Sequence, residues 1–385
     1  MTNLIDFYTK VRQRTERICN PLAIEDYVPQ VVEYASPPKW HLAHTSWFFE
    51  EMILKKQKNY RLFHPDFSYL FNSYYNTVGK RVLRNNRGNQ TRPTVEEVYH
   101  YRSHVDEHMK NLLQSKLEKE THELVLLGLN HEQQHQELLI TDLKYTLGHT
   151  PLFPVYDSEF SICHSREASQ EKGWINIDEG VYNIGYSGNA FCYDNELEQH
   201  KVYLPTSAIR KQLVSNGEFI EFINDGGYEQ FNYWLDEGWA WVNQHNISSP
   251  LYWYKMNKRW HQYSLSKGLV EINLDEVLTH ISFYEAQAFA CYKNLRLPTE
   301  FEWEIAAPKL SWGTRWEWTN SAYLPYPNYK IAPGAVGEYN GKFMINQMVL
   351  RGASLATAPN HSRITYRNFF HPHYQWQYSG IRLAK

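Results

Sequence analysis

The stretch His131-Glu132-Gln133-Gln134-His135 places two imidazoles four residues apart in a strongly helical segment. Positions i and i+4 of an α-helix lie about 40° apart around its axis, so both rings share one face. They are in phase with the apolar stripe of Leu124, Leu127 and Leu138 and are predicted to point into a core, where unpaired polar groups are costly. Such a pair can hold one metal ion. The alternative, a buried pair satisfied by backbone carbonyls, is the less favoured interpretation.

The same five residues match the zinc-protease pattern H-E-x-x-H, in which the glutamate is a general base. That pattern needs a third ligand downstream. The longer metzincin form requires glycine and histidine at positions where this chain has Leu138 and Thr141. A zinc hydrolase is therefore a minority hypothesis.

Length and charge exclude several classes of protein. A chain of 385 residues is long enough for two domains. A net charge of -3 predicts no general attraction to nucleic acid or to an anionic membrane. No apolar run approaches the roughly 18 residues of a membrane helix, and residues 1–14 lack the apolar core of a signal peptide. The four cysteines are widely spaced and are predicted to be reduced thiols, so a soluble, cytoplasmic protein is expected.

The predicted fold class is α+β with two domains. Residues 1–150 are expected to form a helical bundle, and residues 151–173 a linker. Residues 174–385 are expected to be α+β, with short β-like runs between Gly, Asn and Pro turns. The helices expected in the bundle are Asp6–Cys19, Ile24–Glu33 with a break or kink at Pro29, one that starts after Pro37-Pro38, one that opens with Pro93 and the capping box of Thr94 and Glu97, and one from about Glu118 to Gly148. In the second domain, helices are expected over Phe283–Tyr292 and Thr299–Ala307, and strands over Trp174–Ile177 and Gly180–Ile184.

A long polar segment, Phe67–Arg92, interrupts the predicted bundle. Connections this long are usually functional or disordered, and its non-repetitive sequence favours an ordered, functional loop. A second run of histidines, His100, His104 and His108, has the same four-residue spacing but lies beside the apolar stripe of its helix. These three are expected to be solvated rather than metal-bound.

Several short sequence motifs are distributed along both halves of the chain. They are Leu42-Ala43-His44, Tyr74-Tyr75, Arg84 with Arg87, His131-x-x-x-His135-x-Glu137, Arg296-Leu297-Pro298-Thr299-Glu300-x-Glu302-Trp303-Glu304, Trp316-Glu317-Trp318, Leu350-Arg351-Gly352-Ala353-Ser354 and Tyr366-Arg367-Asn368-Phe369-Phe370. Together they resemble the ergothioneine-type sulfoxide synthases. Those non-haem iron enzymes join a DinB-like helical bundle to a formylglycine-generating-enzyme-like, C-type-lectin-like domain.

The resemblance implies a third metal ligand and a cofactor. The third ligand is His44; the helix pattern alone does not separate it from His41, which lies near the same face. Three imidazoles, His44, His131 and His135, would hold Fe(II) and leave positions open for substrates and O₂. The implied reaction joins hercynine to a thiol by a C–S bond and leaves oxygen on sulfur.

The resemblance also implies substrate-binding residues. Arg84 and Arg87 would bind the carboxylate of the sulfur donor, since a guanidinium makes paired, charge-assisted bonds. Gln134 would bond the substrate imidazole, and Glu137, on the other side of the helix, would orient a ligand or a neighbouring helix. The trimethylammonium group of hercynine would lie against ring faces and carbonyls. The residues implied there are Asn368, Phe369, Phe370 and Trp376, whose alternative is a place in the core.

Tyr74 and Tyr75 match a tyrosine pair that one branch of the family uses to deliver a proton during oxygen chemistry. A phenol suits this role because it is neutral at pH 7 and can still give up a proton. Tyr75 is favoured only slightly, because consecutive residues of an extended loop point in opposite directions and the sequence does not say which of the two faces the iron. The alternative is that both tyrosines simply pack between domains.

Two departures from the family pattern keep the substrates open. Gln375 stands where arginine is common, which leaves a selenol donor, and so a selenoneine synthase, as an alternative. The chain ends at Lys385 with no room for the methyltransferase domain of ovothiol synthases, which lowers the case for histidine as substrate. Readings of another class are the zinc hydrolase and a non-catalytic lectin-like module.

Overall fold

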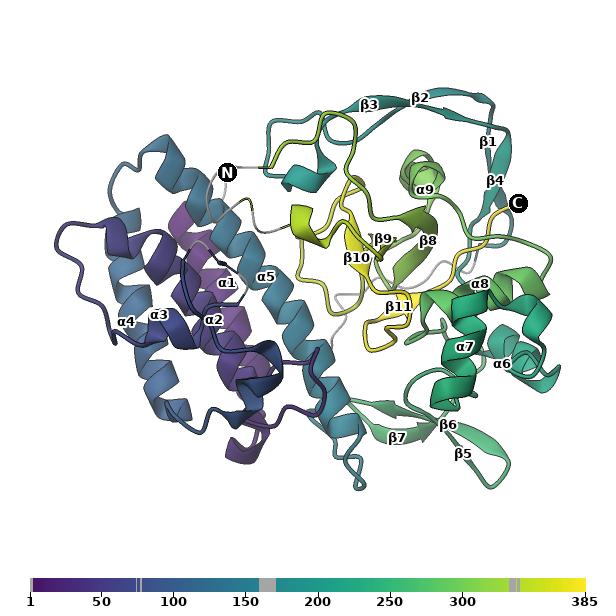
Figure 1. Cartoon of the computed structure of the whole chain (residues 1–385), viewed down its shortest axis with the longest axis horizontal. Helices are drawn as coiled ribbons and strands as arrows, with labels where there is room; N and C mark the ends of the chain where they lie inside the picture. Colours follow the sequence, from purple (N-terminus) through teal and green to yellow (C-terminus); the bar gives the residue numbers. More distant parts are fainter. Residues whose placement is uncertain (1–2, 74, 77, 159–170, 332–336, 338–339) are drawn as a thin grey trace. The chain divides into compact units, whose positions relative to one another are not determined.

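The computed structural model describes residues 3–73, 75–76, 78–158, 171–331, 337 and 340–385. The chain divides into two compact units (Figure 1). The first comprises Met1–Phe160 together with Ala356–His361, and the second comprises Ser161–Leu355 and Ser362–Lys385. The sequence placed the domain boundary in a linker at 151–173 and assigned all later residues to the second domain. The structure instead groups one six-residue segment near the C-terminus with the first unit.

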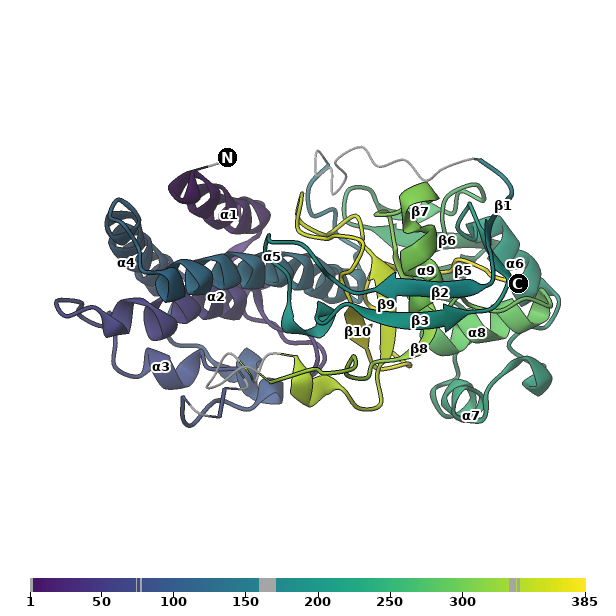
Figure 2. The ribbon, with the colours of Figure 1, turned by 90° about the horizontal axis from the view of Figure 1, so that it is seen from above.

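The first unit is helical, and its longer helices run side by side (Figures 1 and 2). Its helices are α1 (Leu4–Cys19), α2 (Pro38–Met52), α3 (Phe67–Leu70), α4 (Val95–Leu113) and α5 (Lys119–Gly148), with 3₁₀ turns at Ile24–Tyr27, Leu54–Lys56 and Arg84–Asn89. The predicted capping box is present, because Thr94 accepts from the Glu97 N–H and Glu97 from the Thr94 N–H. That this bundle is DinB-like stays a prediction.

One predicted helix of this unit is much shorter than expected, although the interruption predicted at Pro29 is present. Ile24–Glu33 was expected to be helical, but only Ile24–Tyr27 forms a single 3₁₀ turn. Pro29 explains the early end, because proline has no N–H to donate and its ring clashes with the preceding helical turn. The loop Phe67–Arg92, by contrast, contains one short helix and one 3₁₀ turn among its described residues.

Gly128 lets α2 and α5 approach closely. A methyl group at this position would lie 2.7 Å from the Phe49 ring and 2.9 Å from the Phe48 ring. The larger side chains of α2 therefore fill the space that glycine leaves. This close approach brings the histidines of the two helices together.

The second unit contains small sheets and short helices, as an α+β unit should. Its largest sheet has the order β10-β9-β8-β11. The strands are β1 (Trp174–Ile177), β2 (Gly180–Ile184), β3 (His200–Leu204), β4 (Ser207–Arg210), β5 (Trp253–Met256), β6 (Arg259–Ser264), β7 (Gly268–Glu271), β8 (Trp316–Ala322), β9 (Met348–Gly352), β10 (Asn368–Phe370) and β11 (Ser379–Gly380). The helices are α6 (Asn216–Asn224), α7 (Asp236–His245), α8 (Phe283–Tyr292) and α9 (Glu300–Ala306). The sequence predicted α8 and α9 but missed α6 and α7.

Buried ion pairs occupy the interior of the second unit. Arg367 Nε lies 2.8 Å from Glu300 Oε2, and Arg382 Nε lies 2.6 Å from Glu317 Oε2. Arg351 pairs with Glu304. Each of these six side chains is almost completely buried, so removing one partner would leave an uncompensated charge. Most of these residues belong to the strings that carry the family resemblance, which gives those strings a structural role in this unit.

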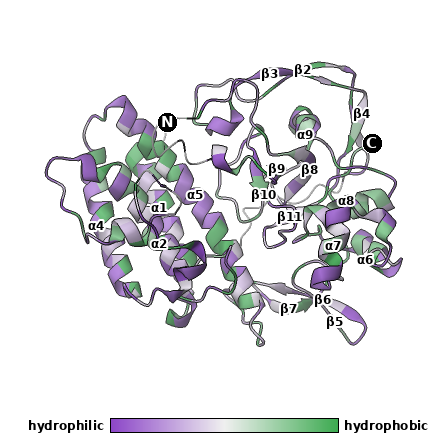
Figure 3. Ribbon diagram, viewed as in Figure 1, coloured by the Kyte–Doolittle hydropathy of each residue, from purple (hydrophilic) through white to green (hydrophobic). Residues whose placement is uncertain are grey.

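The helices of both units mix hydrophobic and hydrophilic residues along their length (Figure 3). Among the described helices, none has both the length and the hydropathy needed to cross a lipid bilayer.

Candidate metal centre

Three histidines from two helices lie together in the first unit. They are His44 of α2 and His131 and His135 of α5, and one ring nitrogen of each lies within 4.8 Å of those of the other two. The ring centroids are 4.5–5.0 Å apart. In the described part of the chain, this is the one group of His, Cys, Asp or Glu side chains arranged to hold a metal ion.

These imidazoles are held in their neutral form. His44 and His131 are buried, and His135 is partly buried. Burial disfavours the charged imidazolium; it lowers the pKa of His131 to about 3 and lowers the pKa of His44 and His135 well below the usual value. Neutral imidazole is the form that binds a metal, so the three rings are ready for ligation near pH 7.

His44 has one nitrogen bonded and one nitrogen left for a ligand. Its Nδ1 donates to the Phe71 carbonyl at 2.6 Å. Its Nε2 is buried and has no hydrogen-bond partner among the described residues. The ring is stacked between Trp40, at 4.4 Å, and Trp47, at 5.3 Å. A buried polar atom left unsatisfied costs about 1–3 kcal/mol, so a metal at Nε2 fits this arrangement.

The structure separates His41 from His44, which the helix pattern did not. His41 lies outside the three-histidine group and contacts one of its members, His135. Its Nδ1 is 2.9 Å from Nδ1 of His135, and its Nε2 is 3.1 Å from Oδ2 of Asp142. Burial lowers the pKa of His41, and Asp142 offsets this in part.

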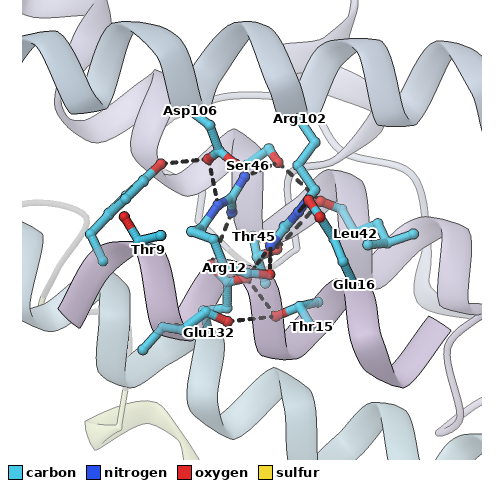
Figure 4. A network of polar contacts seen from close by, with 12 residues as sticks. Thr9, Arg12, Thr15, Glu16, Leu42, Thr45, Ser46, Arg102, Asp106 and Glu132 are labelled. Carbon is cyan, nitrogen blue, oxygen red and sulfur yellow. Dashed lines mark hydrogen bonds and ion pairs between the residues drawn. The ribbon is translucent and has the colours of Figure 1, made fainter. Parts of the chain in front are cut away.

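Glu132 is not available as the general base of an H-E-x-x-H protease. Its carboxylate accepts hydrogen bonds from Arg102 at 2.6 Å, Arg12 at 2.9 Å and Thr15 at 2.6 Å (Figure 4). Burial alone would raise its pKa, but Arg102 and Arg12 outweigh burial and lower that pKa to about 2. The side chain is completely buried and serves to join α5 to α1 and α4.

The other histidine run does not form a metal site among the described residues. His100 is exposed. His104 donates through Nε2 to the Arg61 carbonyl at 3.1 Å, and His108 through Nδ1 to the His104 carbonyl at 2.8 Å. Both rings are therefore engaged with backbone oxygens at a partly exposed surface.

The two predicted arginines have different environments. Arg87 is buried; it donates to Ser36 at 2.8 Å and to Ser73 at 2.9 Å, and its guanidinium carbon lies 3.4 Å from the Trp40 ring centroid. Arg84 is exposed and donates to the Tyr34 carbonyl. Because Trp40 stacks on His44, only Arg87 is placed beside the histidine group.

Tyr75 lies beside Trp47, the second tryptophan that stacks on His44. It is buried, and its ring centroid is 5.5 Å from that of Trp47, which stacks on His44. Its backbone N–H donates to Asn72 Oδ1 at 3.2 Å, and the Asn72 amide donates back to its carbonyl at 3.0 Å. Tyr74 lies outside the described residues.

The segment Ala356–His361 contacts α5 within the first unit, which the sequence did not predict. Thr357 Oγ1 donates to Glu137 Oε2 at 2.9 Å, and His361 Nδ1 is 3.2 Å from Gln133 Oε1. Glu137 thus contacts a neighbouring segment, on a face away from the histidines. Gln134, the predicted imidazole partner, is half-buried on the same helix.

The predicted hercynine-binding residues belong to the second unit. Phe369 stacks on Tyr323 with ring centroids 4.0 Å apart, and Phe370 meets Trp376 edge-on at 5.0 Å. Trp376 is buried, whereas Asn368, Phe369 and Phe370 are partly exposed. The Asn368 side chain accepts from the Phe369 N–H.

Gln375, which is partly exposed, bonds to a buried carboxylate in the second unit. Its amide donates to Glu285 Oε2 at 2.8 Å, while Tyr228 donates to Glu285 Oε1 at 2.6 Å. The glutamine that stands here in place of arginine thus donates to the Glu285 carboxylate, which also accepts from Tyr228.

Comparison with known proteins gives consistent matches. The model of the sulfatase-modifying factor enzyme 1-like domain matches residues 159–312. The hercynine oxygenase of Mycolicibacterium smegmatis is 28% identical over 312 residues, which are 67% of this chain and 70% of that protein. That of Mycobacterium tuberculosis is 28% identical over 66% of this chain and 70% of its own length. The formylglycine-generating enzyme of Thermomonospora curvata is 27% identical over 40% of this chain and 55% of its own. Over about two thirds of its length the chain is thus similar to hercynine oxygenases, and the match to the sulfatase-modifying factor enzyme 1-like domain supports a formylglycine-generating-enzyme-like domain.

Proposed function

We propose that this protein is an Fe(II)- and O₂-dependent sulfoxide synthase that joins hercynine to cysteine or to a cysteine peptide. The observation that carries the proposal is the group of three neutral imidazoles, in which Nε2 of His44 is buried without a hydrogen-bond partner among the described residues. Relatives named hercynine oxygenase support the substrate. In the balanced reaction, an imidazole C–H, a thiol S–H and O₂ give a C–S bond with oxygen on sulfur, plus one water.

His44, His131 and His135 are the residues that would hold the iron. Three nitrogen ligands leave room on an octahedral ion, so bound Fe(II) would supply open positions and the electrons that activate O₂. The tryptophans on either side of His44 exclude water from its ring and fix its plane. The centre is thereby organised before any substrate enters.

We assign binding of the sulfur donor and proton transfer to residues near the two tryptophans that stack on His44. Arg87 would bind the donor carboxylate, since its guanidinium is held flat on Trp40 and presents donors now bonded to two serine hydroxyls. Arg84 would assist from its exposed position. Tyr75 would hold and release a proton next to Trp47, Tyr74 being its companion in the same loop.

Hercynine would be recognised by two groups of residues. Gln134 would bond its imidazole, and Asn368, Phe369, Phe370 and Trp376 would offer ring faces and oxygens to its trimethylammonium group. A cation without N–H groups gains most from aromatic faces, which the stacked and edge-on rings of β10 supply.

An aerobic incubation with Fe(II), hercynine and a panel of thiols and selenols, followed by mass spectrometry, tests this function. The expected product is the hercynyl cysteine sulfoxide or its peptide form, with none formed under anaerobic conditions. Product from a selenol alone would instead make the protein a selenoneine synthase, and product from histidine an ovothiol-type synthase.

The same incubation separates the readings of other classes. A zinc hydrolase would be active without O₂, although the engagement of Glu132 by two arginines argues against that chemistry. A lectin-like binding module would turn over no donor at all.

A further inference from the structure

We propose that His41 and Asp142 are positioning residues that fix the tautomer and the ring orientation of His135, so that its Nε2 is the atom offered to the metal. The proposal rests on the metal centre proposed above and adds two residues that do not themselves ligate. It follows from a chain of three hydrogen bonds that ends on one of the predicted ligands.

The chain begins at a fixed backbone donor. The Ser36 N–H donates to Oδ2 of Asp142 at 2.8 Å, and the same oxygen is 3.1 Å from Nε2 of His41. Nδ1 of His41 is in turn 2.9 Å from Nδ1 of His135. Ser36, His41 and Asp142 are all buried, so water does not compete freely for these groups.

The direction of these bonds follows from the chemistry at one end. A carboxylate only accepts hydrogen bonds, so Nε2 of His41 must carry a proton and donate it. In neutral imidazole the other nitrogen is then an acceptor, which means that Nδ1 of His41 accepts from Nδ1–H of His135. The remaining nitrogen of His135, Nε2, has a free lone pair. The carboxylate thus determines, two rings away, which atom of His135 can bind a metal.

The neighbouring ligand shows the same arrangement with a simpler acceptor. Nδ1 of His44 donates to the Phe71 carbonyl, which also leaves Nε2 for the metal. Orientation of a ligating histidine by a carbonyl or a carboxylate is common at metal sites, and loss of the orienting group typically weakens metal binding by about 10- to 100-fold. His135 differs in having a second imidazole between it and the carboxylate.

Two substitutions at one position isolate the bond to His135. His41→Phe removes the acceptor, whereas His41→Asn keeps an amide oxygen near the place of Nδ1 that can still accept from His135. Both variants lose the contact with Asp142 to the same extent. His104→Ala, which removes a partly exposed imidazole from α4, is the control for loss of a histidine elsewhere.

The measurement is the dissociation constant for Co(II), obtained by chelator competition on the full chain, together with its visible absorption spectrum. We expect His41→Phe to weaken binding by about 10- to 100-fold and to alter the spectrum, and His41→Asn to recover most of the affinity. Affinities of both variants within about threefold of the parent would overturn the proposal. Equal losses in the two variants would also overturn it, because the bond to His135 would then not be the cause.

A second pair of variants covers the case in which His41→Phe does not fold. Asp142→Asn can still place an oxygen where Oδ2 accepts from Ser36 and His41, whereas Asp142→Ala cannot. We expect Asp142→Ala to bind Co(II) more weakly than Asp142→Asn by about tenfold or more, with the unfolding temperature of both metal-free variants as the check on folding. Equal Co(II) affinities would contradict the proposal. Failure of the metal centre itself is distinguishable, since the parent would then bind no Co(II) or His135→Ala would bind it undiminished.

Discussion

The guanidinium of Arg87 lies over the indole of Trp40, with its central carbon 3.4 Å from the ring centroid. The opposite neighbour of that indole is His44, whose ring is stacked at 4.4 Å and tilted by 13°. A cation, an indole and a predicted metal ligand are therefore arranged in one column. Arg84, three residues earlier in the same turn, takes no part in it.

This column predicts that Arg87 governs donor binding more strongly than Arg84. Arg87→Lys keeps the charge but loses the planar fork, so the donor KM should rise by about 10- to 100-fold, corresponding to about 1.5–3 kcal/mol. Arg84→Ala should raise it less, and hercynine KM should change little in either variant. Steady-state kinetics with each substrate varied in turn gives the comparison. Arg81→Ala, which changes a partly exposed arginine of the same loop, is the control. A parallel rise in both KM values would point to a purely structural role.

The metal centre predicts a sharp division among the histidines. His44→Ala, His131→Ala and His135→Ala should each weaken iron binding by more than about 100-fold, because loss of a ligand exceeds the effect of losing an orienting partner. His104→Ala and His108→Ala should leave it unchanged. Metal analysis of the purified variants after Fe(II) loading measures this. If His131→Ala retains iron as the parent does, the site is misplaced.

We predict that loss of the Tyr75 hydroxyl changes the reaction product and leaves the iron content unchanged. Tyr75→Phe keeps the buried ring against Trp47 but removes the hydroxyl, so iron should bind normally while sulfoxide falls and sulfinic acid from simple thiol oxidation rises. Quantifying both products by mass spectrometry gives the ratio. Tyr74→Phe and the double variant are made alongside. The proton-donor role fails if all three give the parent's rate and ratio.

We predict that substitution of Glu132 lowers the free energy of unfolding, which substitution of a catalytic base would not do. Glu132→Gln removes the buried carboxylate that Arg12 and Arg102 share and leaves them only Asp106 and Glu16, so the free energy of unfolding should fall by about 3–5 kcal/mol. Glu120→Gln, exposed on the same helix, should change it by less than about 0.5 kcal/mol. Urea unfolding of the metal-free proteins measures both. A fully stable Glu132→Gln protein that has lost only activity would favour the hydrolase reading.

The same carboxylate predicts a pH dependence. Its folded pKa, about 2, is below the ordinary value of 4.5, so the unfolded state binds the proton more readily as pH falls. The stability that Glu132 contributes is therefore fully present above about pH 4.5 and is lost as pH falls toward 2. The difference in unfolding free energy between the parent and Glu132→Gln should shrink between pH 6 and pH 3.5. A constant difference over this range would show that the carboxylate does not carry the effect.

The local features of this chain follow from the sequence. The spacing of His131 and His135 puts two imidazoles on one helix face whatever the rest of the chain does, because helix geometry repeats every 3.6 residues. Capping boxes likewise set the starts of α4 at Thr94 and α8 at Ser282 through contacts only three residues apart. A local signal for α6 was overlooked, since Ser215 and Glu218 form a capping box, and the break predicted at Pro29 follows the short turn Ile24–Tyr27.

Only the tertiary structure determined which group each buried histidine contacts. His41 and His44 are nearly equivalent on α2 by sequence, but the approach of α5 across Gly128 puts His44 beside two histidines and His41 between His135 and Asp142. Glu132 likewise follows a histidine in a protease-like pattern, yet α1 and α4 supply two arginines that engage it. These outcomes depend on residues 30 to 120 positions apart along the chain, about which periodicity carries no information. Helix geometry sets the face on which a side chain lies, and packing between helices determines what it contacts there.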